Sequence, residues 1–428
     1  MESLRDYCAY LQDLIAARDS SPRRLWLSRL PPVFDGQPSR VTRLVVEREV
    51  LKSLGAFFTG HELANETASL ANLEPKKSTV LDPACGSGDL LIAAAKKFSV
   101  TGSPNAALAE WSNRLLGFDI DPTFAEIARL RLRLLFLSTC RGAPDSHVLR
   151  SSFPKIRPGD FLSIRQQALA GVTDFILNPP FISMKTPEGC DWSTGSVSAA
   201  AVFVDRCARM GPPGSNITAI LPDVLRSGSR YASWRRNIKS RFETSSRKSI
   251  GPFCGADIDV FFLVGRARLD APIRALMPKH RSSNRLARIC DAASVSVGAV
   301  VPYRHVESGN AVAFLDVRGA PAWKTVNRIY NRIRFSGTVH KAPFIAIRRT
   351  SSPSDNLRAI ATIVSGKRNV AVENHLLVLK PHSGTLSDCR KLLMSLQHPR
   401  TTGWLNRRIR CRHLTAKSIQ QLPIWGEQ

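Results

Sequence analysis

The sequence predicts an α/β protein whose mostly parallel sheet carries helices on both faces. From Thr79 to about Gly265, short apolar runs alternate with segments of helical pattern that are roughly ten or more residues long. Segments of that length can return the chain to the starting edge of the sheet, as parallel pairing requires. The apolar runs are Thr79–Asp82, Leu115–Ile120, Asp174–Asn178, Ile217–Pro222 and Asp259–Val264, and the clearest helical segments are Asp121–Ser138 and Ser198–Met210.

The chain divides into three parts that differ in their predicted secondary structure. Residues 1–54 form an N-terminal helical extension with an amphipathic start that Pro22 and later prolines interrupt. Residues 55–268 hold the predicted sheet, and a stretch rich in proline and arginine follows it. Residues 269–428 are a separate domain with shorter, β-like runs at Val295–Val301, Ala311–Leu315, Pro343–Ile347, Ile360–Val364 and His375–Leu379.

The charge of the chain points to a polyanionic partner. Its 428 residues include 61 Lys and Arg against 34 Asp and Glu, a formal net charge of +27. The basic excess is densest in residues 281–428, which carry 24 basic and 7 acidic residues. Because such an excess exceeds what solubility requires, we expect contact with nucleic acid. With 43% hydrophobic residues, the composition excludes a fibrous or wholly disordered chain.

The cysteines and apolar runs indicate a reducing, cytoplasmic setting. The nine cysteines are scattered singly, so neither a disulfide framework nor a zinc module is expected, and no metal site is predicted. The N-terminus has early acidic residues without an apolar core, and no run is long enough to cross a membrane. We therefore expect a cytoplasmic protein of prokaryotic type, associated with the nucleoid.

The strongest local motif is the turn from Asp82 to Gly88, of sequence Asp-Pro-Ala-Cys-Gly-Ser-Gly, between a strand and a helix. Small residues there let a ligand lie against bare backbone amides at a helix N-terminus. Asp119 closes the next strand, where a carboxylate can accept hydrogen bonds from ribose hydroxyls. The dinucleotide and P-loop fingerprints are absent, and Asp82 suits a cationic ligand end. S-adenosylmethionine, which has an ammonium, a sulfonium and a ribose, fits this pattern.

A second motif, Asn178-Pro179-Pro180-Phe181, follows a later strand. The prolines hold the chain extended and remove two amide donors, which leaves carbonyls free to accept. The Asn178 side-chain oxygen and the Pro179 carbonyl can both accept from one exocyclic amino group, and Phe181 offers a face for a planar base. Taken alone, this motif is equally compatible with a rigid structural turn.

These motifs resemble the N6-adenine DNA methyltransferases of the gamma order, the Taq-type group, over roughly residues 54–424. Asp82–Gly88 is similar to their S-adenosylmethionine motif and Asn178–Phe181 to their catalytic motif. The resemblance implies a seven-stranded, mostly parallel methyltransferase sheet in residues 55–268 and an α+β target-recognition domain in residues 269–428. Gly60 replaces the proline of the family's cofactor-closing motif, and Asp89 replaces a small or apolar residue.

The resemblance also implies further site residues. Phe58 and Thr59 would close over the methionine end of the cofactor, Ile120 would face its adenine, and Asp160 and Phe161 would bind the adenine amine and edge. The cofactor-binding set is then Phe58, Thr59, Asp82, Pro83, Ala84, Cys85, Gly86, Gly88, Asp119, Ile120, Asp160 and Phe161. The implied catalytic set is Asn178, Pro179, Pro180 and Phe181, and the candidate DNA contacts are Arg348, Arg349, Lys367 and Arg368.

We therefore expect a site-specific DNA methyltransferase that transfers a methyl group to N6 of an adenine flipped out of double-stranded DNA, in a restriction-modification or related defence system. A cognate endonuclease would be a separate protein. Two alternatives stay open. The same motif occurs in enzymes that methylate RNA or protein glutamine, and the departures at Gly60 and Asp89 allow a DNA-binding subunit that has lost catalysis.

Overall fold

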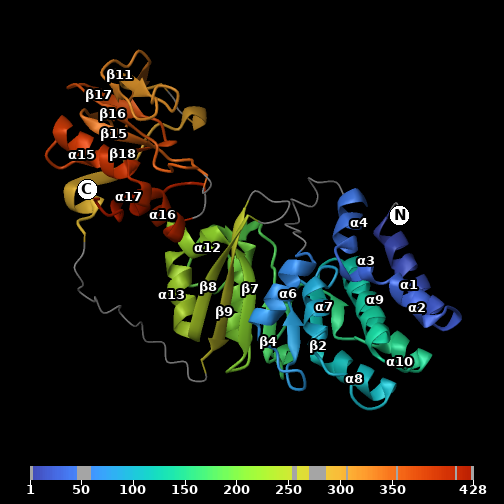
Figure 1. Cartoon of the computed structure of the whole chain (residues 1–428). Helices are drawn as coiled ribbons and strands as arrows, with labels where there is room; N and C mark the ends of the chain where they lie inside the picture. Colours follow the sequence, from blue (N-terminus) through green and yellow to red (C-terminus); the bar gives the residue numbers. More distant parts are fainter. Residues whose placement is uncertain are drawn as a thin grey trace. The chain divides into compact units, whose positions relative to one another are not determined.

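The fold is built from two compact units, which are described separately below (Figure 1). The computed structural model describes residues 3–45, 59–252, 258–268, 286–304, 307–352, 355–409 and 412–425. One unit holds the described residues within 1–225 and 232–276, and the other holds those within 226–231 and 277–428. Among the described residues, no helix combines the length and apolarity that crossing a membrane requires.

A seven-stranded sheet of order β3-β2-β1-β4-β7-β9-β8 forms the centre of the first unit (Figure 1). β1 to β4 and β7 are parallel, whereas β9 runs antiparallel to both β7 and β8. The strands are β1 (Val80–Asp82), β2 (Leu115–Asp119), β3 (Ile156–Pro158), β4 (Asp174–Leu177), β7 (Asn216–Pro222), β8 (Phe242–Pro252) and β9 (Asp259–Ala267). The predicted mostly parallel seven-stranded sheet is therefore confirmed.

Helices connect these strands, and a small hairpin follows β4. Helix α6 (His61–Leu70) precedes β1. The connections include α7 (Asp89–Ala95), α8 (Pro104–Arg114), α9 (Pro122–Thr139), α10 (Ser146–Ser151), α11 (Ala199–Met210), α12 (Asp223–Ser227), α13 (Ala232–Arg241), the 3-10 turns η1 (Phe161–Ser163) and η2 (Gln166–Leu169), and the hairpin β5 (Ser183–Lys185) and β6 (Ser196–Ser198). The 3-10 turn η3 (Ser229–Tyr231) follows α12 in the chain but belongs to the second unit. At α9, Pro122 occupies the first turn and Asp121 caps it by accepting from the Thr123 amide at 2.7 Å.

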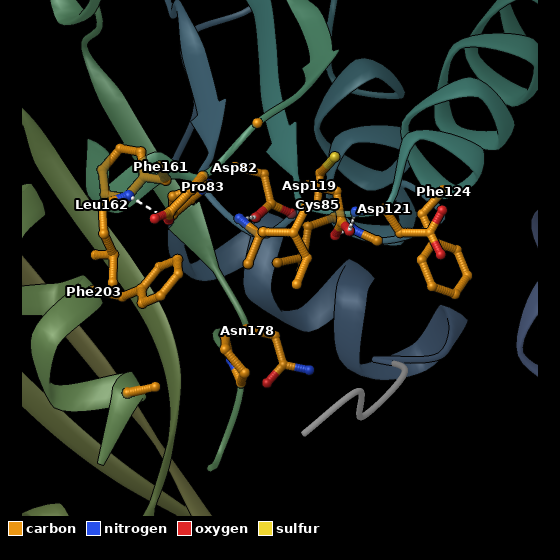
Figure 2. Close-up of a pocket in the computed structure, with 18 of the residues that line it drawn as sticks. Asp82, Pro83, Cys85, Asp119, Asp121, Phe124, Phe161, Leu162, Asn178 and Phe203 are labelled. Atoms are coloured by element: carbon orange, nitrogen blue, oxygen red, sulfur yellow. Dashed lines mark hydrogen bonds between the residues drawn. The ribbon is translucent and has the colours of Figure 1, made fainter. Parts of the chain in front are cut away.

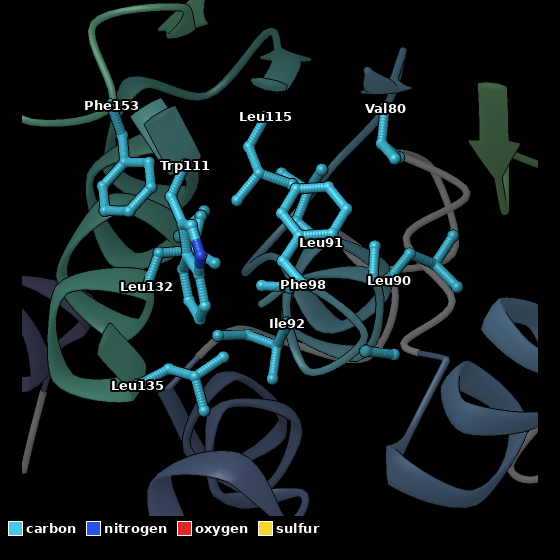
Figure 3. Close-up of a cluster of buried hydrophobic side chains, with 14 of the residues drawn as sticks. Val80, Leu90, Leu91, Ile92, Phe98, Trp111, Leu115, Leu132, Leu135 and Phe153 are labelled. Atoms are coloured by element: carbon cyan, nitrogen blue, oxygen red, sulfur yellow. The ribbon is translucent and has the colours of Figure 1, made fainter. Parts of the chain in front are cut away.

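Helix α9 contributes side chains to two separate apolar clusters, from different faces of the helix. On one side, Leu132 and Leu135 pack against strand and helix side chains such as Val80, Leu91 and Trp111 (Figure 3). On the other side, α9 packs against the N-terminal helices, which are α1 (Leu4–Ser20), α2 (Arg23–Ser28), α3 (Pro31–Phe34) and α4 (Gln37–Val45). The described residues of the N-terminal region therefore share a core with α9.

The second unit contains a five-stranded sheet of order β10-β18-β15-β16-β12 and a four-stranded sheet of order β13-β11-β17-β14. Helix α15 contacts β15, β16 and β18 of the five-stranded sheet. The elements are α14 (Ile289–Ala292), β10 (Ala293–Val297), η4 (Pro302–Arg304), β11 (Asn310–Leu315), β12 (Thr325–Val326), β13 (Arg332–Phe335), β14 (His340–Lys341), β15 (Phe344–Arg348), β16 (Ala361–Val364), β17 (Asn369–Val372), β18 (Leu376–Pro381), α15 (Leu386–Gln397), α16 (Pro399–Arg408) and α17 (Ala416–Gln420). This unit has the expected α+β character.

Candidate active site

A cavity of about 650 Å³ lies at the carboxyl ends of β1, β2 and β4, where an α/β sheet of this kind binds its ligands. Residues from three predicted motifs line it together (Figure 2). The lining comprises Thr59, Asp82, Pro83, Ala84, Cys85, Gly86, Ser87, Asp89, Leu90, Asp119, Ile120, Asp121, Pro122, Phe124, Gly159, Asp160, Phe161, Leu162, Asn178, Pro180, Ile182, Met184, Ala199 and Phe203. The fold thus joins the predicted cofactor turn and the catalytic motif in one space.

The turn between β1 and α7 forms one wall of the cavity. Both of its glycines have positive φ angles, +49° at Gly86 and +85° at Gly88. At Gly88 there is also no room for a side chain, because an added Cβ would lie 2.9 Å from the Cβ of Ala128 on α9. Gly88 does not line the cavity itself. Its role in the structure is to let α9 approach the start of α7.

Asp119 fixes this turn to the end of β2. One carboxylate oxygen accepts from the Gly86 amide at 2.9 Å, and the other accepts from the Asp121 amide at 3.0 Å. Burial raises the pKa of Asp119, and these two amides oppose that shift. Each carboxylate oxygen keeps acceptor capacity beyond its one amide, so Asp119 can still accept from a ligand hydroxyl.

Asp82 is the most deeply buried acid of the cavity, with 1% of its surface exposed. Burial raises its pKa to about 8 against an ordinary value of 3.8, although the Ala84 amide, which donates to it at 3.1 Å, lowers the pKa in part. The neighbouring Asp119 raises the pKa further. A buried carboxyl in this position favours a cationic ligand group, which would hold it in the charged form.

Asp89, which departs from the family pattern, has a structural partner. Its carboxylate accepts from the guanidinium of Arg131 on α9 at 2.9 Å, and the Arg131 side chain is fully buried. The same guanidinium donates to the Ser87 carbonyl at 2.5 Å and to the Val33 carbonyl of α3 at 2.9 Å. Arg131 thus ties the cofactor turn to the N-terminal helices, a link that neither the sequence motifs nor their spacing indicated.

Aromatic rings line the opposite end of the cavity. Phe161 and Phe203 stack with their ring centroids 5.8 Å apart, and both are largely buried. Ile120 also lines the cavity, and 68% of it is exposed. Asp160 accepts from the Leu162 amide at 2.8 Å and from the Ser163 hydroxyl at 3.0 Å. A planar ring system has apolar surface to lie against here, because Phe203 is both buried and part of the lining.

Asn178 follows β4 and lines the cavity with Pro180. Its amide nitrogen donates to the Thr59 hydroxyl at 3.1 Å, which fixes the orientation of the side-chain amide. Pro179 is buried, and Phe181 is half-buried against the apolar cluster of Ile220, Val260 and Phe262; neither residue lines the cavity. The structure therefore brings two of the four predicted catalytic residues to the cavity. Phe58, predicted to bind cofactor, lies outside the described residues.

Sequence reasoning missed several lining residues, of which Ile182 and Met184 are the most informative. They come from the segment that leads from Asn178 into the β5–β6 hairpin, directly after the catalytic motif. No motif identified them, although their position immediately after Phe181 is a usable signal. Gly159, Leu162 and Ala199 likewise line the cavity without any sequence pattern that would distinguish them from core residues.

The four candidate DNA contacts belong to the second unit and lie in two places. Arg348 is the last residue of β15, at the end that pairs with the start of β16, and Arg349 follows it, whereas Lys367 and Arg368 lie in the turn after the end of β16. The two pairs are therefore separated by the length of the strand. Arg348 and Arg349 are half-buried and donate to the carbonyls of Ala320 and Asn374, at 3.2 and 3.3 Å. Lys367 and Arg368 are exposed.

Comparison with known proteins finds a sequence match within the first unit. The family model described as N-6 DNA Methylase matches residues 46–181, a range that includes the cofactor turn and ends at Phe181. The resemblance to N6-adenine DNA methyltransferases is confirmed. Because this N-6 DNA methylase match ends at Phe181, assignment to the gamma order and the role of the C-terminal unit stay predictions. No curated protein matches the chain.

Solved structures with a similar fold include methylases and restriction enzymes. A modification subunit of a putative type I restriction enzyme from Vibrio vulnificus is 18% identical, with a TM-score of 0.39, over 51% of this chain and 47% of that one. A putative class I S-adenosylmethionine-dependent methyltransferase from Listeria monocytogenes is 15% identical, with a TM-score of 0.38, over 60% and 75%. The type IIG restriction endonuclease BpuSI is 14% identical, with a TM-score of 0.40, over 87% and 58%. The chain thus spans about half the length of the first of these.

Proposed function

We propose that the chain transfers a methyl group from S-adenosylmethionine to N6 of an adenine flipped out of duplex DNA, in a restriction-modification or related defence system. The observation that carries this proposal is a single cavity lined by the Asp82–Gly86 turn, Asp119 and Asn178. The N-6 DNA Methylase match over residues 46–181 supports the substrate class. Binding within a cavity of this kind needs a flipped base, because N6 of a paired adenine lies inside the duplex.

The residues present fit S-adenosylmethionine, which when bound would supply the methyl group from its sulfonium. The buried Asp82 carboxyl would hold a cationic end, and Asp119 would accept from ribose hydroxyls. Phe161, Phe203 and Ile120 offer apolar surface to the adenine ring. The cavity volume of about 650 Å³ falls within the range of small-molecule sites.

Asn178 would then orient the target amine. Its side-chain oxygen accepts from an N6 hydrogen while its amide nitrogen stays bonded to Thr59. S-adenosylmethionine would supply the methyl group, with its sulfur keeping the electrons of the broken carbon–sulfur bond, and the amine held by Asn178 would form the new bond and then release one proton to solvent. Most of the rate acceleration would come from orientation and from acceptors placed for the positive charge that develops on nitrogen.

The test is transfer of radiolabelled methyl to duplex DNA, with digestion and nucleoside mass spectrometry. We expect N6-methyladenine from the wild-type chain. Asn178→Ala should lower turnover by about 100-fold or more, the scale of losing one preorganised polar group, and should keep cofactor affinity within about twofold. Asn113→Ala, at an exposed position in α8, is the matched control and should methylate normally.

Each alternative predicts a different result in this experiment. If RNA or protein glutamine becomes labelled and no N6-methyladenine forms in DNA, the chain methylates one of these substrates, and the proposed reaction on DNA is excluded. A chain that binds duplex DNA but not S-adenosylmethionine would be a DNA-binding subunit without catalysis. Normal turnover by Asn178→Ala would remove Asn178 from the mechanism.

A further inference from the structure

A long acid-free segment crosses the second unit. Between Asp316 and Asp355 the chain has eight basic residues and no Asp or Glu. Six of the eight are exposed, namely Arg318, Lys324, Arg328, Arg332, Arg334 and Lys341. Since surfaces of globular proteins normally mix both signs of charge, a segment with one sign is suited to a polyanion.

The backbone of this segment is well fixed by its neighbours. β13 pairs with β11, and the Asn331 carbonyl accepts from the Phe314 amide at 2.8 Å. Arg332 and Arg334 are two residues apart on β13, so they project from the same face of this strand. β13 is the edge strand of the four-stranded sheet, and arginines there also prevent pairing with another chain.

The turn that carries Lys367 and Arg368 lies directly beside this segment. The Ser365 amide donates to the Val326 carbonyl at 2.8 Å, and the Arg368 guanidinium donates to the Asn327 carbonyl at 3.1 Å. Lys341 pairs with Asn369 in the same sheet. We call Arg328, Arg332, Arg334, Lys341, Lys367 and Arg368 the basic surface. Among the described residues, none of these six forms an ion pair with an acidic side chain.

Tyr330 stands out within this surface. Its side chain is 84% exposed, between Arg328 and Arg332, in the connection that leads to β13. Cations alone would suffice to bind an acidic protein. An exposed aromatic side chain that is flanked by cations in the sequence adds apolar surface, which suits the sugars that lie beside the phosphates of nucleic acid.

We propose that Tyr330 places its ring against a deoxyribose of the target duplex while Arg328 and the rest of the basic surface contact the phosphates. This inference rests on the proposed function and deepens it, since it names the part of the second unit that holds the DNA. It extends the earlier candidates Lys367 and Arg368 and assigns no phosphate contact to Arg348 and Arg349, which are half-buried at the other end of β15.

The test measures binding of the full chain to a fluorescently labelled 30-base-pair duplex by anisotropy, over a series of KCl concentrations. Tyr330→Ala should weaken binding by about tenfold at every salt concentration, the scale of losing one buried aromatic contact. Tyr330→Phe should bind within about twofold of wild type. Arg328→Gln should reduce the magnitude of the slope of log affinity against log salt by about 0.9.

Tyr303→Ala is the matched control, because Tyr303 is 77% exposed in the same unit but lies outside the acid-free segment. It should bind DNA as the wild type does. Unchanged S-adenosylmethionine affinity shows in each variant that the first unit is folded, and the far-ultraviolet circular dichroism spectrum reports on the whole chain.

Failure of the inference and failure of the proposed function give different results. If the wild type binds and methylates the duplex but Tyr330→Ala binds equally well, the role of Tyr330 is overturned and the proposed function stands. If the wild type neither binds nor methylates duplex DNA, the proposed function fails first. If polyglutamate displaces the duplex as well as unlabelled duplex does, the surface fits an acidic polypeptide and the inference is wrong.

Discussion

Two carboxyl groups of the cavity, Asp82 and Asp119, are buried to different degrees and have different partners. Asp119 accepts from two backbone amides that favour its charged form, whereas Asp82 accepts from one and is almost fully buried. Burial therefore dominates at Asp82 and raises its pKa to about 8. Without a cationic ligand, the folded protein holds a proton there that the unfolded chain releases near an ordinary pKa of 3.8.

This difference predicts a pH dependence of stability. A carboxyl whose pKa is higher in the folded state stabilises the fold fully below its unfolded pKa, and that stability is lost as the pH rises toward the folded value near 8. Asp82→Asn cannot ionise, so the melting temperature of the variant minus that of the wild type should increase between pH 5 and pH 8.5. Thermal unfolding of both proteins at matched ionic strength measures this difference.

The control for Asp82 is Glu62→Gln, which removes one exposed carboxyl from α6. Its melting temperature should follow that of the wild type at a constant offset across the same pH range. Parallel profiles for Asp82→Asn and the wild type would contradict the argument from burial.

At the scale of elements, the turn between β1 and α7 depends on two glycines for different reasons. Gly86 has a φ of +49° and open space around an added Cβ, so only the left-handed backbone would resist a side chain. Gly88 has a φ of +85°, and an added Cβ would also meet the Cβ of Ala128 at 2.9 Å. The second glycine is required by packing between α7 and α9 as well as by backbone conformation.

We predict that Gly86→Ala lowers the free energy of unfolding by about 1–2 kcal/mol and Gly88→Ala by about 2–5 kcal/mol, because overpacking adds to the backbone strain. Ala128→Gly in the Gly88→Ala background should recover part of the loss, although glycine within α9 costs about 1 kcal/mol itself. Urea unfolding measures all four proteins. Equal losses for the two glycine variants, or no recovery in the double variant, would contradict the close approach.

The elements that sequence patterns predicted are those with strong apolar runs. All five predicted runs of the first unit form strands, and Asp121–Ser138 and Ser198–Met210 correspond to α9 and α11. β3 and β8 were missed, because β3 is only three residues long and β8 is mostly polar at Glu243–Ser249. Residues 386–408 form two helices, α15 and α16, since Pro399 cannot lie in a helix interior and begins α16 instead.

The candidate site was predictable where residues follow strands and unpredictable where it depends on packing. Asp82, Asp119 and Asn178 end their strands, and the parallel sheet brings these ends together. The ion pair between Asp89 and Arg131 joins residues 42 positions apart, and the Phe161–Phe203 stack joins two different connections. Only the folded arrangement of α7, α9 and α11 reveals such pairs.

At the scale of the whole molecule, the described N-terminal helices share a core with the first unit. Tyr7 and Leu11 of α1 and Trp26 of α2 are almost fully buried, and this cluster includes Ile127 and Leu134 of α9. The Val33 carbonyl accepts from the same buried arginine that holds the cofactor turn. Residues 3–45 therefore stabilise α9, whose Arg131 holds the turn between β1 and α7.

We predict that Leu11→Ala destabilises the sheet as well as α1. Removing a fully buried leucine side chain costs about 2–5 kcal/mol, whereas Leu25→Ala, at a site 51% exposed, should change stability by about 0.5 kcal/mol at most. If α1 and the sheet unfold together, native-state hydrogen exchange followed by mass spectrometry should show the same loss of protection in α9 and β1 as in α1. Loss confined to α1 would mean that the N-terminal helices open independently, and Arg131 would then remain bonded to the cofactor turn without them.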